Sequence, residues 1–446
     1  MEEEPSNGLL FWCMRWSIFN YNLETTNYII VRNTFSGALI KFYKNIYEKI
    51  DNSIKNNFID DSIKEYINPL KKNGLIVDDN TDEKNNYLRQ LKSDFNSDTL
   101  FSLVIAPTYK CNFSCPYCYE NGIENSESLA KEDKWLLLDY IKNYLNNNRN
   151  IKKVNIFLYG GEPTLSWDYI ESILPEIKNM LSNMNISFCT HITTNGYLFD
   201  ERKADFLADY NWKSAEITLD GTENIHNKRR CLKNGGETFK QIVNNISYII
   251  DRRYLQKINI RINISSDNEL DVLSLIDFLK ERFGTESVHI SLGPITDTVK
   301  ETNAHKYIND VILTNESWCD TYLKLYKKVK DSGFEVTNFY TLDSFCLAKQ
   351  KHSIIVGADK SIYKCLSMIG RKRCSLDTLD KQNFSIDSYL NYDDINKCFE
   401  KECPLVPSCL SGCVFEKYIR NLTNPFCRKK DYDAINKGIC EILYEE

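Results

Sequence analysis

The sequence is poor in the residues and patterns that define several large protein classes. Its 446 residues include only 17 glycines and 10 prolines, too few for a collagen-like or linker-dominated chain. No run of 18 apolar residues occurs, so we expect no membrane-spanning helix. The 56 lysines and arginines are outnumbered by 62 aspartates and glutamates, and this net charge of −6 argues against nucleic acid as a partner.

What the chain does contain is apolar surface and cysteine. Hydrophobic residues make up 42% of the sequence, enough to bury the cores of two or three domains. The acidic start, Met1-Glu2-Glu3-Glu4, leads into no long apolar signal segment, so we expect a cytoplasmic protein. In that reducing compartment, 16 cysteines are more consistent with metal binding than with disulfides.

The cysteines divide the chain into three parts. Only Cys13 precedes a trio between residues 111 and 118, and eight cysteines lie between residues 365 and 440. We therefore expect domains at 1–98, 99–310 and 311–446. For Cys13, Cys189, Cys231, Cys319 and Cys440 we expect ordinary buried thiols, since free cysteine is among the most buried residue types.

The middle part alternates short apolar runs with amphipathic helical patterns, which predicts an α/β fold with a parallel sheet. Six such units are most simply a partial (β/α)6 barrel of TIM-like architecture, with its active site at the carboxyl ends of the strands. The six runs are residues 103–106, 154–158, 186–193, 215–219, 258–264 and 288–292.

The predicted strand ends carry chemically distinctive residues. Cys111, Cys115 and Cys118 form a C-x3-C-x2-C loop after the first strand. Three thiolates on a four-iron cluster leave one iron open, whereas structural zinc usually takes four ligands; part of a split zinc site is the alternative. The following strand ends contribute Gly160, Gly161, Glu162 and Pro163, then Asn195, then Thr218, with Arg230 beyond. Singly, a glycine pair is usually a turn and an arginine a solvated charge.

Taken in order, these motifs resemble the radical S-adenosylmethionine (SAM) superfamily. The resemblance implies a [4Fe–4S] cluster on Cys111, Cys115 and Cys118, with the aromatic Tyr117 before the last cysteine, and SAM chelated to the open iron. It implies that residues 160–163 contact the methionine amine of SAM. By the same resemblance, Thr218 and Arg230 contact SAM, and the polar strand end at Asn195 suits a ribose or carboxylate.

The C-terminal cysteines are similar to the SPASM domain, which holds two auxiliary [4Fe–4S] clusters. The chain departs from that pattern at Lys360, where a glycine is expected, and at Glu400, where a cysteine is expected. The resemblance implies a first cluster with an open iron, unless Cys374 or His352 closes it; a purely structural zinc-ribbon pair is the alternative. The implied ligands are Cys346, Cys365 and Cys413 for the first cluster and Cys398, Cys403, Cys409 and Cys427 for the second.

Residues 1–98 suggest a winged-helix-like module of small strands and three helices. The spacing of Ala38, Ile40, Phe42 and Ile46 predicts one of these helices. With 12 basic and 15 acidic residues, a net of −3, the module is not expected to read DNA. In radical SAM enzymes that modify ribosomally made peptides, such a module binds the precursor's leader as an added strand. A structural cap or a dimer interface is the alternative.

The resemblance therefore implies a radical SAM/SPASM peptide maturase of the thioether-forming, sactipeptide or ranthipeptide type. A 5′-deoxyadenosyl radical would take hydrogen from a precursor peptide, and a peptide cysteine on the first auxiliary cluster would bond to that carbon. The enzyme would draw electrons from a donor such as flavodoxin or ferredoxin. Formylglycine formation by an anaerobic sulfatase maturase, carbon–carbon or side-chain crosslinking, and zinc-dependent peptide binding without catalysis are the alternatives. Leu366, where sulfatase maturases look for an acid, and the long front module argue against the first of these.

Overall fold

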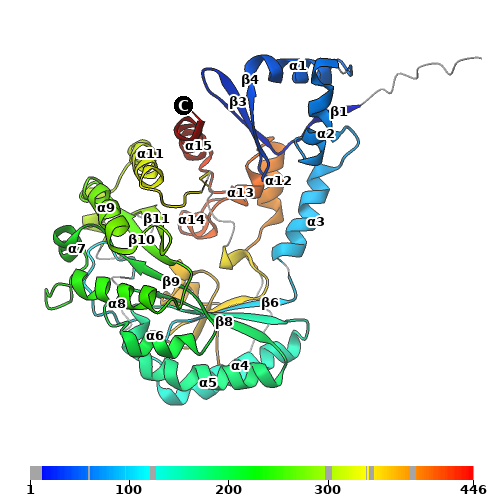
Figure 1. Ribbon diagram of the computed structural model, residues 1–446. Coiled ribbons are helices and arrows are strands. Elements are labelled where there is room, and N and C mark those ends of the chain that lie inside the picture. Colours follow the sequence, from blue (N-terminus) through cyan, green and yellow to red (C-terminus); the bar gives the residue numbers. More distant parts are fainter. Residues whose placement is uncertain are drawn as a thin grey trace, which may run out of the picture.

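The structure is a computed structural model that describes residues 13–58, 61–95, 97–120, 127–296, 304–337, 339–340, 346–381 and 388–444. A curved sheet with helices along its outer side forms the main body (Figure 1). The N-terminal strands and helices, in blue, stand beside the C-terminal helices α12 and α13. Over these described ranges, no helix is long and apolar enough to cross a membrane.

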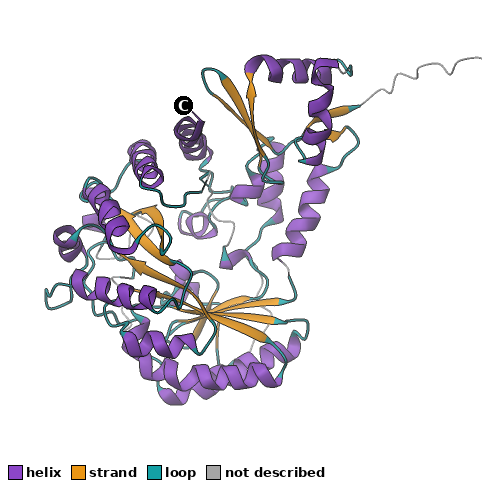
Figure 2. Ribbon diagram, viewed as in Figure 1, coloured by secondary structure: helices purple, strands orange, loops and turns teal. Residues whose placement is uncertain are grey.

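The six apolar runs predicted as strands form parallel strands that extend from one edge of the sheet, in the order β11-β10-β9-β8-β7-β6. Figure 2 shows the helices between them on one side of the sheet. The strands are β6 (Leu100–Ile105), β7 (Lys153–Leu158), β8 (Ser187–Thr194), β9 (Trp212–Thr218), β10 (Ile258–Ile264) and β11 (Val288–Pro294). The helices are α4 (Lys134–Asn147), α5 (Trp167–Asn183), α6 (Glu201–Ala208), α7 (Glu223–Arg229), α8 (Phe239–Asp251) and α9 (Asp271–Phe283).

Strand β10 shows why the sheet has one apolar and one polar face. Its four isoleucines at alternate positions, from Ile258 to Ile264, are all buried in the core that the helices share. Asn259, Arg261 and Asn263 lie between them and face the other side, because successive strand side chains point in opposite directions. The face of β10 that points away from the helices is therefore polar.

The sheet continues past the predicted boundary at residue 310. Strand β12 (Ser353–Val356) pairs in parallel with β6, and β13 (Ser361–Tyr363) and β14 (Asp377–Thr378) follow antiparallel, which makes nine strands. The backbone N–H of Ala106 donates to the carbonyl of Val356 at 2.9 Å. The segment between Cys346 and Cys365 is thus attached to the strand that leads into the cysteine loop at 111–118.

The N-terminal part contains two small antiparallel sheets, β1 with β5 and β2-β3-β4, together with three helices. The helix predicted from residue 38 is wrong over its first half, because residues 39–43 form strand β4 and the helix begins at Lys44. Spacings of two place Ala38, Ile40 and Phe42 on one face of a strand. The elements are β1 (Met14–Trp16), β2 (Asn20–Glu24), β3 (Tyr28–Asn33), β4 (Leu39–Tyr43), α1 (Lys44–Lys55), α2 (Lys64–Lys72), β5 (Ile76–Asp78) and α3 (Glu83–Phe95).

This N-terminal part packs directly on the C-terminal cysteine-rich region. Phe19 and Tyr87 share an apolar cluster with Val406, and the Tyr21 hydroxyl donates to Asp433 at 2.6 Å. The remaining helices are α10 (His305–Val311), α11 (Asn315–Asp331), α12 (Tyr392–Glu400), α13 (Val406–Cys409), α14 (Val414–Ile419) and α15 (Lys429–Tyr444). Short 3-10 turns lie at residues 61–63, 131–133, 163–166, 347–349, 366–368 and 372–374.

Candidate active site

The cysteine loop follows β6 at the carboxyl edge of the sheet. Two backbone hydrogen bonds hold it against the segment that follows α7: Ser114 N–H to the Cys231 carbonyl at 2.9 Å, and Lys233 N–H to the Asn112 carbonyl at 2.9 Å. This attachment brings Arg230, which directly precedes Cys231, next to the loop.

The three thiols of the loop lie together. Burial raises the pKa of the Cys111 thiol to about 12, and the neighbouring Glu162 and Cys115 add to the rise. Burial also raises the pKa of Cys118, to which Cys115 and Cys111 both contribute. Buried thiolates that repel one another need a positive partner, and an iron–sulfur cluster provides one.

No three His, Cys, Asp or Glu side chains in the described ranges are close enough to share a single metal ion. Around a four-iron cluster each thiolate binds a different iron, so the ligands stand farther apart than around one zinc ion.

The backbone after β7 lies so close to the backbone before the cysteine loop that only glycine fits at positions 160 and 161. A Cβ on Gly160 would lie 2.5 Å from the Thr108 carbonyl oxygen, and one on Gly161 would lie 2.5 Å from the Lys110 carbonyl oxygen. Gly160 also has a φ of +122°, which only glycine adopts readily. The pair thus packs the 160–163 segment against the start of the cysteine loop.

The Glu162 carboxylate ties two strand ends together. It is 1% exposed and accepts four hydrogen bonds. Three reach Oε1, from the Thr164 N–H at 3.0 Å, the Thr164 hydroxyl at 2.6 Å and the Thr194 hydroxyl at 2.6 Å. The fourth joins the Asn195 N–H to Oε2 at 2.7 Å. Pro163, buried, begins the 3-10 turn beyond it.

Asn195 links this strand end to the cysteine loop. Its side-chain amide donates to Asn112 Oδ1 at 2.8 Å and approaches the Cys111 sulfur at 3.9 Å. Thr218 ends β9 and is 8% exposed on the same carboxyl edge. Residues after β7 and β8 thus contact the cysteine loop that follows β6, and Thr218 ends the next strand of the sheet.

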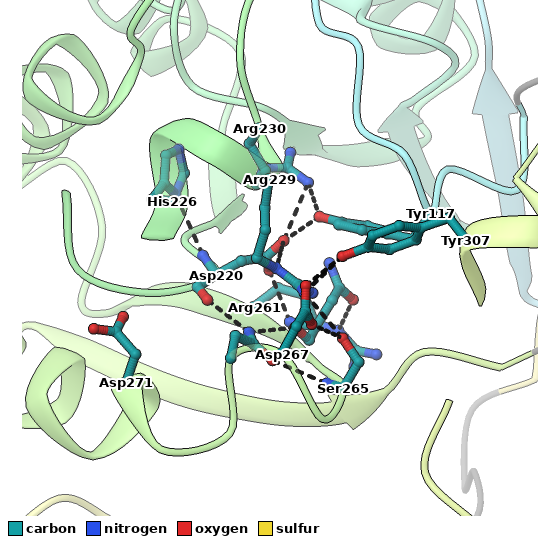
Figure 3. A network of polar contacts seen from close by, with 12 residues as sticks. Tyr117, Asp220, His226, Arg229, Arg230, Arg261, Ser265, Asp267, Asp271 and Tyr307 are labelled. Atoms are coloured by element: carbon teal, nitrogen blue, oxygen red, sulfur yellow. Dashed lines mark hydrogen bonds and ion pairs between the residues drawn. The ribbon is translucent and has the colours of Figure 1, made fainter. Parts of the chain in front are cut away.

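A buried charge network lies beside the loop (Figure 3). The Tyr117 hydroxyl donates to Asp220, which is fully buried, and accepts from Arg230 at 2.6 Å. The Arg230 guanidinium also lies 5.7 Å from the centre of the Phe113 ring. Burial raises the pKa of Tyr117, so this phenol stays protonated. Tyr117 and Arg230 are thus held rigidly by the carboxylate after β9.

The sequence did not point to the other half of this network. Arg229 donates to Asp267, to Ser265 at 2.9 Å and to the Tyr307 hydroxyl at 3.2 Å (Figure 3). The adjacent arginine pair was the one available signal, because Asp267 and Tyr307 are remote in sequence. His226 accepts from the Asp220 N–H at 3.3 Å, and burial holds its pKa well below the usual range.

Four polar atoms on or beside the loop are buried with no hydrogen-bond partner among the described residues: Asn112 Nδ2, Glu120 Oε2, Arg229 Nε and Arg230 Nε. Unsatisfied buried donors and acceptors are rare in native proteins and mark places where a bound group completes the bonding. SAM carries an amine and a carboxylate that match such donors and acceptors. The residues present therefore fit a cluster with bound SAM.

The C-terminal cysteines separate into two groups. In the first thiol group, burial raises the pKa of Cys365 to about 12, and Cys346 and Cys413 both contribute. In the second thiol group, burial raises the pKa of Cys398 to about 11, with contributions from Cys403, Cys409 and Cys427. Cys398, whose sequence spacing departs from the SPASM pattern, thus lies with its three predicted partners.

His352 and Cys374 have other partners. The His352 ring bonds to the Tyr144 hydroxyl at 2.8 Å through Nδ1 and to Asp98 at 3.3 Å through Nε2, so both of its nitrogens are engaged at the amino end of β12. Cys374 is 6% exposed, in an apolar cluster that Cys365 borders, and its thiol shares a hydrogen bond with Tyr418.

The five cysteines expected to be ordinary buried thiols behave differently from one another. Cys189, Cys319 and Cys440 are buried as expected. The expectation of burial is wrong for Cys13, which is exposed, and only half right for Cys231, which is partly exposed beside the cysteine loop.

Residues 105–279 match the sequence profile of the Radical SAM superfamily, so the parallel barrel with its cysteine loop is a radical SAM domain. Among solved structures, anSMEcpe with bound AdoMet superposes with a TM-score of 0.59 at 18% identity, covering 78% of this chain and 97% of that one. Streptococcus suis SuiB bound to precursor peptide SuiA superposes with a TM-score of 0.52 at 16% identity, covering 92% and 98%. At these identities the likeness is one of fold.

The relatives that match by sequence include a cyclopropyl synthase and a sulfatase-maturating enzyme. The radical SAM cyclopropyl synthase TigE of Paramaledivibacter caminithermalis is 24% identical over 64% of this chain, which spans 59% of that protein's length. A cysteine-type anaerobic sulfatase-maturating enzyme of Clostridium novyi is 28% identical over 70% of this chain and 87% of its own length.

Proposed function

We propose that the protein is a radical SAM enzyme that matures a ribosomally made peptide, forming thioether crosslinks to peptide cysteines. The observation that carries the proposal is the first thiol group, in which three thiols gather and the two candidates for a fourth ligand have other partners. A four-iron cluster on Cys346, Cys365 and Cys413 would have one iron open to a substrate thiolate.

In this proposal Cys111, Cys115 and Cys118 hold the radical cluster, and residues 160–163, Asn195, Thr218 and Arg230 contact SAM. The bound groups would supply a radical that takes one hydrogen from a peptide carbon and an acceptor for the electron released when the thiolate bonds to that carbon. The protein's own part is positional. Glu162 joins two strand ends, and Asp220 keeps Tyr117 and Arg230 in place beside the loop.

The N-terminal part would bind the leader of the precursor. Its sheet order, β2-β3-β4, leaves β2 and β4 as edge strands, and an edge strand can pair with an extended peptide. The fold likeness to SuiB, solved with a precursor peptide and covering 92% of this chain, supports a peptide substrate. A protein such as flavodoxin or ferredoxin would deliver electrons.

The first experiment is anaerobic reconstitution with iron and sulfide analysis. We expect about twelve irons per chain for three four-iron clusters. Replacing Cys111, Cys115 and Cys118 together by alanine should remove about four irons and abolish SAM cleavage, while Cys319→Ala, a buried control, should keep both. Stoichiometric zinc without iron would refute the proposal that the protein is a radical SAM enzyme.

The second experiment is mass spectrometry of a cysteine-containing precursor after turnover. Loss of two hydrogens per crosslink, with cysteines that resist alkylation, supports thioether formation. Free thiols beside a new carbon–carbon bond contradict it. Cys374→Ala should leave the iron content and the crosslink intact, whereas loss of iron from this variant would identify Cys374 as the fourth ligand.

The sulfatase-maturating enzyme of Clostridium novyi, matched over 87% of its length, favours formylglycine formation as a second candidate. Mass spectrometry of the product distinguishes thioether formation from formylglycine formation. Conversion of a substrate cysteine to formylglycine removes its sulfur, so the product is lighter by far more than two hydrogens. That product from a sulfatase peptide would replace the thioether proposal.

A further inference from the structure

The turn between Cys409 and Cys413 has an unusual backbone. Leu410, Ser411 and Gly412 have φ values of 51°, 62° and 87°, three consecutive left-handed residues of which two carry side chains. Leu410 and Ser411, the two with side chains, each cost about 1–2 kcal/mol in this conformation, so neighbouring groups must hold the turn in place. The turn joins a member of the second thiol group, Cys409, to a member of the first, Cys413.

A buried lysine holds this turn. The Lys349 side chain is 4% exposed, and its ammonium donates to the Leu410 carbonyl at 2.6 Å and to the Gly412 carbonyl at 2.7 Å. An ammonium is costly to bury unless it is well bonded, so the two carbonyls and the lysine stabilise each other. Lys349 lies three residues after Cys346, and its N–H donates to the Cys346 carbonyl at 2.9 Å. One cation therefore joins the segments that carry Cys346, Cys409 and Cys413.

The turn also meets a fourth cysteine-bearing segment. A Cβ on Gly412 would lie 2.1 Å from the carbonyl oxygen of Phe426, the residue before Cys427. Only glycine permits this approach, so the turn packs against the backbone that leads into the last ligand of the second thiol group. The Lys349 carbonyl in turn accepts from the Ser388 hydroxyl at 2.6 Å.

The positive charge of Lys349 lies between the two thiol groups along this turn. Its two carbonyl partners belong to Leu410, which directly follows Cys409, and to Gly412, which directly precedes Cys413. One buried cation is therefore bonded next to a member of each group.

We propose that Lys349 is a positioning residue that fixes the spacing of the two auxiliary clusters and raises the reduction potentials of both. The inference rests on the proposed function, which supplies the clusters. Reduction adds an electron to each cluster, and a nearby buried cation stabilises the reduced form because little solvent screens it.

The test is an EPR-monitored potentiometric titration of the reconstituted full-length protein, with iron analysis of every sample. Lys349→Met keeps the apolar stem but removes the charge and both donors. Lys349→Arg keeps the charge. The matched control is Lys364→Met, which removes another fully buried ammonium that donates to two backbone carbonyls, those of Ser353 at 2.8 Å and Lys351 at 3.1 Å, away from the turn.

We expect Lys349→Met to lower the potentials of both auxiliary clusters by at least a tenfold change in each reduction equilibrium, which is 59 mV for one electron. Lys349→Arg should stay near the wild type, and Lys364→Met should leave the potential of the second cluster unchanged. Wild-type potentials in Lys349→Met, or an equal shift of the second cluster in Lys364→Met, would overturn the inference.

If Lys349→Met loses auxiliary iron, the arginine variant decides. If Lys349→Arg keeps all of its iron and shows wild-type reduction potentials, the result supports a cation that holds the turn. If both variants lose iron, the result overturns the role of Lys349 in setting the reduction potentials. The proposed function fails separately: a wild-type chain with only about four irons has no auxiliary clusters to tune.

Discussion

Replacing Asp220 with asparagine tests the buried charge network beside the cysteine loop. The change keeps the shape of the side chain and leaves an oxygen that can accept from the Asn263 N–H, which donates to Asp220 Oδ1 at 2.9 Å. It removes the fully buried negative charge of Asp220, which lies 3.9 Å from both Arg229 and Arg230. The guanidiniums of Arg229 and Arg230, which are 4% and 10% exposed, would then have less negative charge nearby to balance their own.

The expected loss follows from that burial. Removing one partner of a buried ion pair costs about 3–5 kcal/mol, because the remaining charge stays desolvated. The carboxylate of Asp267, which also pairs with Arg229, is 33% exposed, so Asp267→Asn should cost about 1 kcal/mol or less. The two substitutions are chemically identical and differ in burial, which makes Asp267→Asn the matched control.

Urea unfolding of the metal-free protein, followed by tryptophan fluorescence, measures both losses in free energy of unfolding. A double variant, Asp220→Asn with Arg229→Met, should recover part of the loss, because it removes a charge of each sign. A loss below about 1 kcal/mol for Asp220→Asn, or equal losses at the two aspartates, would refute the reasoning.

Three further outcomes follow from single contacts. Glu162→Gln replaces an acceptor oxygen with an amide group, so we expect the unfolding free energy to fall by about 1–3 kcal/mol and calorimetry to show weaker SAM binding. The control Glu171→Gln, at a side chain that is 28% exposed, should be nearly neutral. Gly161→Ala should displace the start of the cysteine loop and lower iron incorporation, whereas Gly236→Ala meets only side-chain atoms, at 3.0 Å or more, and should not. Burial lowers the pKa of His226 below 6.5, so the neutral ring contributes to stability above pH 6.5 and this contribution is lost as the pH falls below that value. The urea concentration at the unfolding midpoint should therefore be lower at pH 5.5 than at pH 7.5, and the difference should be smaller in His226→Gln.

The barrel was predictable because its signals are local. In β10, alternate isoleucines from Ile258 to Ile264 define a buried face within seven residues. The cysteine loop at 111–118 and the glycine pair at 160–161 are likewise short motifs placed at strand ends. Where the local signal was mixed, prediction failed. Ala38, Phe42 and Ile46 are four apart, a helical spacing, but Ala38, Ile40 and Phe42 are two apart, a strand spacing, and the structure divides that stretch between β4 and α1.

The sequence by itself determined the six strands of the barrel and the cysteines available as ligands, because periodicity and motif spacing are properties of neighbouring residues. Only the tertiary structure decided which thiols gather with which, that His352 bonds to Tyr144 and Asp98, and that Lys349 reaches the turn after Cys409. These contacts join residues tens to hundreds of positions apart, and the packing of the whole chain brings them together.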